Sequence, residues 1–306
     1  ARSSVTVPCY SNGHITLDIY TPTRPASPTD ARSTAAILYL PRVPALLGNE
    51  RDDANIKAFL EQQSHPVVSI KYRLSREHPY PMPIHDVVTG FDWVKENLLP
   101  KRAISRAGRA DHIGKVAVCG ELVGGGLAAM LALTECRVGQ PGVVAAALKD
   151  PLVDWVDVLD GPREIVGGIV SDGNGLHSLR SQAFRKPEHY FDPFASPMLF
   201  LRSAGLEIPL APAEIPSDDL ELLSYLERQE FERSQQDLHT GTLQDAQSLK
   251  SRRTMKTAKR YPSASLGLKL PDVRVWTSNH SLLRGQAEEF VRRLRQSHLR
   301  QASAGD

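Results

Sequence analysis

The sequence predicts an α/β fold with a doubly wound, mainly parallel sheet and a helical insertion. In the first half of the chain, short apolar runs alternate with segments of helical periodicity. A strand at 116–119 continues through the turn GELVGG into an alanine- and leucine-rich helix. From about residue 161 to 260 the sequence is polar and mostly helical in character, and a strand signal returns only at 272–277.

The N-terminal part begins with two β-type segments around the turn Ser11-Asn12-Gly13, so we expect an antiparallel hairpin. The run AAILYL is apolar throughout, as in a strand buried on both faces, and two prolines end it. IKAFLEQQ has helical spacing, PVVSIKY is another buried strand, and IHDVVTGFDWVKENL carries an apolar helical stripe. These predicted elements span 5–8, 15–21, 35–40, 56–63, 66–72 and 84–98.

The second half adds a strand at 143–148 (VVAAAL), a strand at 272–277 (DVRVWT) and an amphipathic helix at 281–295. Between them lies the polar block, with a helix expected at 219–233, which reads as a lid over the sheet. We therefore expect a core formed by 1–158 and 262–306 and a helical cap at 159–261.

Composition excludes several classes of function. The net charge of +2 and the scattered basic residues, apart from the run 250–259, argue against a nucleic-acid partner. No apolar run reaches the roughly 18 to 20 residues that span a bilayer, so no membrane partner is expected. Three unpaired cysteines and no signal-peptide pattern favour a cytoplasmic protein. His78 and His85 match no metal-ligand spacing and no dinucleotide motif occurs, so neither a metal nor a cofactor is expected.

Several stretches resemble those of the α/β-hydrolase fold, specifically of the hormone-sensitive-lipase-like esterases and their fungal relatives. The matching stretches are ITLDIYTP, GNERDD, YRLSREHPYPMP, GKVAVCGELVGGGLAAMLAL and VRVWTSNHSLLRGQAEEFVRRLR. The resemblance implies a small-molecule substrate and a sheet that continues beyond 272–277. This chain leaves no room for that further strand, so we expect an exposed sheet edge that favours a homodimer.

The frame Gly120-Glu121-Leu122-Val123-Gly124 has the strand–turn–helix form of a G-x-S-x-G nucleophile elbow. Leu122 stands at the nucleophile position, and its side chain has no nucleophilic chemistry. The resemblance further aligns Pro41-Arg42-Val43-Pro44 with a glycine loop that supplies oxyanion donors, and Ser281 with the triad acid. It places the family's histidine in a loop that follows a further strand, and this chain is expected to lack both. We therefore expect that serine-dependent ester hydrolysis is lost.

Other side chains remain candidates for chemistry or binding. Glu121, Asp154 and His280 are candidate acids or bases, because each follows or ends a strand near the expected crevice. The expected pocket walls, besides His280, are Leu122, Arg42, Val43 and Trp155.

Three functions remain open. A pocket reused for non-hydrolytic chemistry, such as cyclisation, addition or dehydration, needs shape and one or two polar groups. A binding protein would hold a small molecule without turnover, and a scaffold would fill the pocket with its own side chains. Residual esterase activity is the further alternative.

Overall fold

The computed structural model describes residues 1–22, 35–42, 50–62, 65–99, 113–159, 165–166, 169–170, 173–205 and 256–303. The chain divides into two compact units, Ala1–Ser203 with Thr257–Asp306, and Ala204–Lys256. Nearly all of the second unit lies outside the described residues, and so do the helix expected at 219–233 and most of the basic run. The boundaries of the cap at 159–261 therefore stay a prediction.

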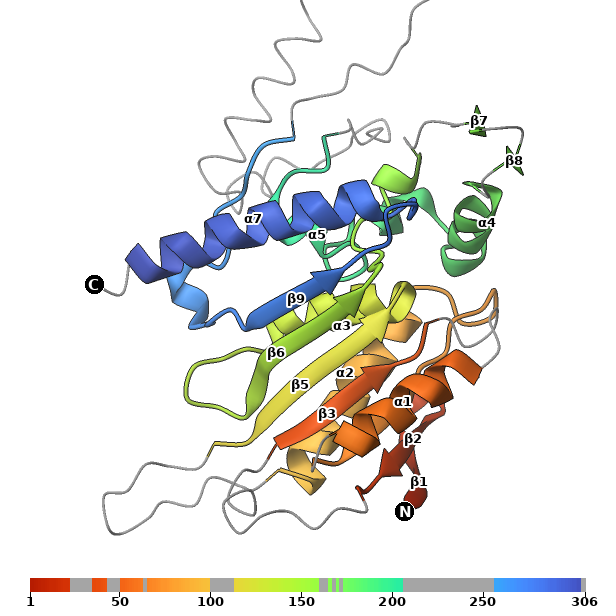
Figure 1. Ribbon diagram of the computed structural model, residues 1–306, viewed down its shortest axis with the longest axis vertical. Coiled ribbons are helices and arrows are strands. Elements are labelled where there is room, and N and C mark those ends of the chain that lie inside the picture. Colours follow the sequence, from red (N-terminus) through yellow and green to blue (C-terminus); the bar gives the residue numbers. More distant parts are fainter. Residues whose placement is uncertain are drawn as a thin grey trace, which may run out of the picture. The chain divides into compact units, whose positions relative to one another are not determined.

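One mixed, mainly parallel sheet of seven strands organises the first unit, in the order β1-β2-β4-β3-β5-β6-β9 (Figure 1). β1 pairs antiparallel with β2, and β2 pairs antiparallel with β4, whereas all the other neighbours are parallel. The prediction of a mainly parallel sheet is thus confirmed, and β1 and β9 are its edge strands among the described residues. The strands are β1 (Arg2–Pro8), β2 (His14–Tyr20), β3 (Ala35–Leu40), β4 (Val67–Lys71), β5 (Lys115–Glu121), β6 (Gly142–Lys149) and β9 (Asp272–Trp276).

Helices alternate with the strands as the periodicity indicates. The α-helices are α1 (Glu50–Gln62), α2 (Met82–Asn97), α3 (Val123–Thr134), α4 (Gly173–Ala183), α5 (Met198–Leu201) and α7 (Arg284–Ser303). Short 3-10 turns occupy Tyr10–Asn12, Asp157–Leu159, Pro187–Phe191 and Ala264–Leu266. A small hairpin, β7 (Ile165–Val166) with β8 (Ile169–Val170), has no counterpart in the prediction, because two-residue strands give no alternation to detect.

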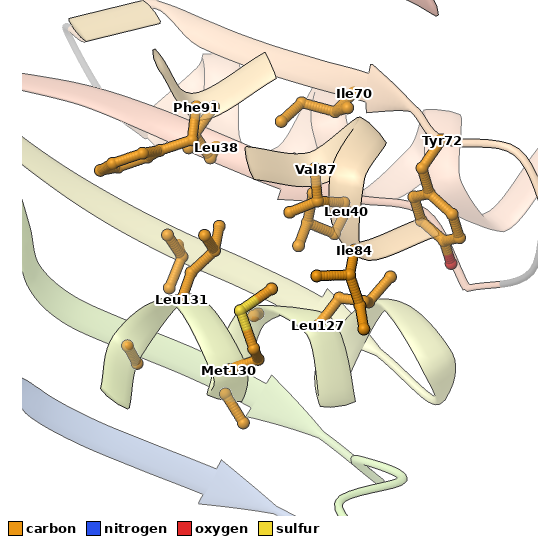
Figure 2. Packing of buried hydrophobic residues seen from close by; sticks show 14 of the residues in the cluster. Leu38, Leu40, Ile70, Tyr72, Ile84, Val87, Phe91, Leu127, Met130 and Leu131 are labelled. Carbon is orange, nitrogen blue, oxygen red and sulfur yellow. The ribbon is translucent and has the colours of Figure 1, made fainter. Parts of the chain in front are cut away.

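The main core lies on the face of the sheet that α2 and α3 cover. Leu38 and Leu40 of β3 point to this face, where they meet apolar side chains of both helices (Figure 2). α3 is buried along almost its whole length, which explains its composition of glycine, alanine and leucine. Ile37 and Tyr39 alternate to the opposite face and form a smaller cluster with Ile56 of α1. The sheet thus places the turn between β5 and α3 at the carboxyl ends of its central strands.

Candidate functional site

The turn between β5 and α3 has the backbone of a nucleophile elbow. Leu122 has φ 53° and ψ −118°, a region that side-chain-bearing residues avoid. A Cβ at Gly124 would lie 2.3 Å from the carbonyl oxygens of Leu40 and Pro41, and one at Gly126 would lie 2.1 Å from that of Leu152. Only glycine fits at these two positions, because the close neighbours are backbone atoms.

Hydrogen bonds tie the elbow to the neighbouring loops. The Leu122 amide donates to the Lys149 carbonyl (3.1 Å), and the Leu122 carbonyl accepts from the Leu152 amide (3.0 Å). The Gly124 amide donates to the Arg42 carbonyl (3.3 Å). The structural half of the elbow is therefore complete, although the side chain that it presents is a hydrocarbon.

Hydrogen bonds to its carbonyl oxygens hold the loop after β3 in place. The Tyr72 hydroxyl donates to the carbonyls of Pro41 (2.6 Å) and Arg42 (3.2 Å). Pro41 has no amide hydrogen to offer an oxyanion. The Nε atom of Arg42 is buried and has no hydrogen-bond partner, and Val43 lies outside the described residues.

Glu121 is buried beside the elbow, with 7% of its side chain exposed. Its Oε1 lies 2.9 Å from Nη2 of Arg51, on α1, and its Oε2 lies 3.9 Å from Nζ of Lys149. Oε2 makes no hydrogen bond. Glu121 is therefore a paired carboxylate with one open acceptor oxygen.

Asp154 is fully buried in a charged cluster. Its Oδ2 lies 2.7 Å from Nη2 of Arg202, which also lies 2.6 Å from Oδ2 of Asp157. Its Oδ1 accepts the amides of Val156 and Asp157, as in a turn-capping aspartate. Burial and, after it, the nearby Asp157 carboxylate raise the pKa of Asp154 to about 6, although the Arg202 guanidinium acts in the opposite direction. These contacts give Asp154 a structural role.

The remaining candidates are Trp155 in the core and the neighbouring residues His280 and Ser281 on the loop after β9. Trp155 is buried in an aromatic cluster with Tyr80 and Phe184, at centroid distances of 5.8 and 5.1 Å. His280 is exposed on the loop after β9, and its amide contacts the Ser278 side chain at 3.4 Å. The Ser281 hydroxyl oxygen accepts the Leu283 amide at 3.3 Å. Within the described part of the chain, no hydrogen bond or ion pair joins any of these side chains to Leu122.

Cys119 precedes the elbow on β5 and is buried. Its thiol donates to the Leu38 carbonyl at 3.3 Å. Burial raises the pKa of Cys119 to about 12, so almost none of it is a thiolate at neutral pH. Cys119 is therefore no substitute nucleophile.

A cavity of about 260 Å³ opens between α1 and the carboxyl ends of β5, β6 and β9. Glu121, Lys149 and Trp276, the last residues of these three strands, line it together with Tyr39, Phe59 and Cys119. A second hollow of about 410 Å³ lies between β9 and α7. Leu122 lines neither of the two. The first cavity lies at the carboxyl ends of parallel strands, which is where such sheets bind ligands.

In the described residues, no group of three or more histidine, cysteine or acidic side chains is placed to hold a metal ion. Within the same ranges, none of the helices combines the length and the apolar composition needed to cross a bilayer.

The fold agrees with a comparison against known families. A family model described as alpha/beta hydrolase fold matches residues 47–225, more than half of the chain. The chain belongs to the alpha/beta hydrolase fold family. The matched range includes the elbow, the cavity lining from α1, β5 and β6, and the Asp154 cluster.

Two similar proteins are named as esterases. Esterase LipI of Mycobacterium tuberculosis is 38% identical over 89 residues, which are 29% of this chain and 25% of that protein. Carboxylesterase NlhH of the same organism is 36% identical over 85 residues, 28% of this chain and 24% of that protein. The match therefore spans about a quarter of the length of these relatives.

Solved structures of the alpha/beta hydrolase fold cover more of the chain. Carboxyl esterase 2 of the mycorrhizal fungus Tuber melanosporum has a TM-score of 0.58 and 15% identity, with 97% of this chain and 73% of that chain covered. An arylesterase has a TM-score of 0.56 and 16% identity, with coverage of 97% and 72%. At such identities the likeness shows the fold alone.

Sequence reasoning missed the partners of the candidate carboxylates. Arg51 lies in the stretch GNERDD, which supports the family resemblance, but nothing in its pattern indicates a contact with Glu121. Arg202 lies 48 positions from Asp154. No local signal predicts either pair, because each joins elements that meet only in the folded chain.

Proposed function

We propose that this member of the alpha/beta hydrolase family binds a small organic molecule and does not hydrolyse esters by the serine mechanism. The observation that carries the proposal is Leu122, which adopts the elbow conformation at the nucleophile position with a hydrocarbon side chain. Without a hydroxyl or thiol there, no acyl-enzyme forms at the elbow. The cavity at the carboxyl ends of β5, β6 and β9 supports a binding function.

Reuse of the site for cyclisation, addition or dehydration has less support than binding. Such chemistry needs a polar group that is free to act on a substrate. One oxygen of Glu121 is engaged by Arg51 and both oxygens of Asp154 are engaged, while His280 points from an exposed loop. The three candidates also line no common cavity, since only Glu121 borders the one described above.

The test uses p-nitrophenyl butyrate as both substrate and ligand. We expect saturation transfer from the protein to the intact ester in ligand-observed NMR, with no release of p-nitrophenolate above the buffer rate. We also expect no labelling by a fluorophosphonate probe, which reacts with activated serines. Ester cleavage that the fluorophosphonate abolishes would overturn the proposal, and so would the absence of any binding.

Residual esterase activity is the second candidate, because the named relatives are an esterase and a carboxylesterase. It predicts cleavage of p-nitrophenyl butyrate that Leu122→Ala leaves unchanged, since an unidentified nucleophile would then carry the reaction. Rates of p-nitrophenolate release no higher than the buffer rate, for both the wild type and this variant, would exclude it.

Two structural proposals accompany the function. The insertion at 159–261 would form a helical cap. The β9 edge, which pairs only with β6 among the described strands, would join two copies as a homodimer. Light scattering distinguishes the 33.7 kDa monomer from a dimer of twice that mass. A monomeric mass at micromolar concentration would contradict the proposed dimer.

A further inference from the structure

The cavity beside α1 combines apolar and aromatic lining residues with one buried carboxylate. Cys119 and Glu121 of β5, and Ala147 and Lys149 of β6, alternate onto the same face of the sheet. Phe59 lies on the α1 side, and Trp276, with 53% of its surface exposed, lies on the β9 side. The floor of the cavity is formed by the small side chains of Cys119 and Ala147, and aromatic side chains form its walls. This combination suits a planar molecule.

Glu121 provides the polar anchor. Its side chain is more than nine-tenths buried and lines the cavity, yet Oε2 makes no hydrogen bond. Lys149 Nζ stands 3.9 Å away, beyond hydrogen-bond distance. A buried acceptor without a donor is costly, so this oxygen is placed to receive a hydrogen bond from a ligand.

The other buried polar groups around the cavity are already satisfied. The Tyr39 hydroxyl donates to Asp52 (2.6 Å) and accepts from Asn55 (3.1 Å). The Cys119 thiol donates to the Leu38 carbonyl. Among these groups, only Oε2 of Glu121 lacks a hydrogen-bond donor.

The charges around the cavity select a neutral ligand. Arg51 and Lys149 are the cations beside Glu121, and Asp52 behind Tyr39 adds a second carboxylate. The two positive and two negative groups balance. An ammonium ligand would meet the cations, and a carboxylate ligand would meet the open oxygen of Glu121, so both are disfavoured.

Size sets a further limit. An apolar cavity of about 150 Å³ accommodates benzene, so the cavity of about 260 Å³ accommodates two fused aromatic rings. We propose that this cavity binds a small, neutral, planar aromatic molecule whose hydroxyl group donates a hydrogen bond to Oε2 of Glu121. The proposal rests on the ligand-binding function proposed above and names the class of ligand and the anchor.

The experiment compares 2-naphthol with 2-methoxynaphthalene, which has a similar shape but no donor, in NMR titrations of the full chain. We expect the wild type to bind 2-naphthol at least five-fold more tightly. Ala147→Leu fills the floor of the cavity and should weaken binding at least ten-fold. The matched control is Ala145→Leu, because Ala145 lies on the same face of β6 but does not line the cavity, and binding should stay within two-fold.

Glu121→Gln tests the anchor, since a neutral amide oxygen accepts a weaker hydrogen bond than a carboxylate. The preference for 2-naphthol over the methyl ether should fall below two-fold. If this variant does not fold, the proposal is still tested by the preference of the wild type for 2-naphthol and by the comparison of Ala147→Leu with Ala145→Leu.

Absence of 2-naphthol binding, equal affinity for the two compounds, or unchanged binding by Ala147→Leu would each overturn the inference. If p-nitrophenyl butyrate still binds intact in that case, only this inference fails. If the ester is cleaved in a reaction that a fluorophosphonate blocks, the proposed function fails, and the naphthol titrations decide the cavity separately.

Discussion

The amide of Leu152 donates a hydrogen bond to the carbonyl oxygen of Leu122 over 3.0 Å. This bond and the one from the Leu122 amide to the Lys149 carbonyl hold the two peptide groups that flank the Leu122 Cα, where φ is 53°. A leucine in this conformation is strained by about 1 to 3 kcal/mol, and the surrounding structure has to maintain it. The strain of the elbow thus persists without the nucleophile that such a turn presents.

This strain predicts an inverted order of stability at position 122. Leu122→Ala removes packing and keeps the strain, whereas Leu122→Gly removes both. Glycine normally costs about 0.4 to 1 kcal/mol through the unfolded chain, so we expect the glycine variant to be more stable than the alanine variant by roughly 1 kcal/mol. Urea denaturation measures this difference.

Leu60, a half-buried residue of α1, supplies the control. There the glycine variant should be less stable than the alanine variant by about 1 kcal/mol, the ordinary order within a helix. The same order at both positions would show that Leu122 is not strained.

Two helical glycines predict opposite responses to alanine. At Gly126 in α3 the added Cβ would lie 2.1 Å from the Leu152 carbonyl oxygen, and at Gly285 in α7 it would meet nothing within 4 Å. We expect Gly126→Ala to destabilise the protein by on the order of 3 kcal/mol. Gly285→Ala should stabilise it by up to about 1 kcal/mol, through helix propensity. Thermal unfolding of the two variants checks both signs, and a neutral Gly126→Ala would contradict the tight elbow.

Asp154 predicts a pH dependence of stability. Its pKa is about 6 in the folded chain against an ordinary value of 3.8 for an aspartate, because burial and then Asp157 disfavour the charged form. Between these two values the folded state binds the proton more tightly than the unfolded state does. The contribution of Asp154 to stability is therefore complete below about pH 4 and is lost as the pH rises through about 6.

The size of this effect is on the order of 3 kcal/mol between pH 4 and pH 7. Asp154→Asn cannot titrate, so its free energy of unfolding should fall less over that interval than that of the wild type. Chemical denaturation at several pH values gives the slope of the free energy of unfolding against pH for each protein. The contributions of the other carboxylates are common to both and cancel in the difference between the slopes. Equal slopes would mean that Asp154 is ionised throughout.

The cysteines predict slow alkylation of the native protein. Burial raises the pKa of Cys119 to about 12 and that of Cys136 to about 11, and Cys9 is buried as well. Against a free thiol with a pKa near 8.5, the thiolate fraction of Cys119 at pH 8 falls by on the order of a thousand-fold. Iodoacetamide labelling followed by mass spectrometry should modify Cys119 only after denaturation. Rapid labelling in the native state would identify a reactive thiol instead.

Much of the fold follows from local sequence. The hairpin around Asn12-Gly13, the apolar strand AAILYL and the helix from 84 to 98 lie within a few residues of β1–β2, β3 and α2. Period-2 and period-3.6 patterns carry this information, because each records which face of an element is buried. The limits of α1 and α7 are less well predicted: α1 begins six residues earlier, at Glu50, in a polar stretch without apolar periodicity.

The sequence by itself determined that an elbow frame is present and that Leu122 cannot act in it. Glycine spacing and side-chain chemistry are local properties, so both conclusions need only the residues from Gly120 to Gly126. Only the tertiary structure decided what the neighbouring carboxylates do. Glu121 meets Arg51 of α1, and Asp154 meets Arg202, because packing brings distant elements within 3 Å. Burial, which depends on the whole fold, then leaves one oxygen of Glu121 without a hydrogen bond beside a cavity and holds Asp154 in an ion pair.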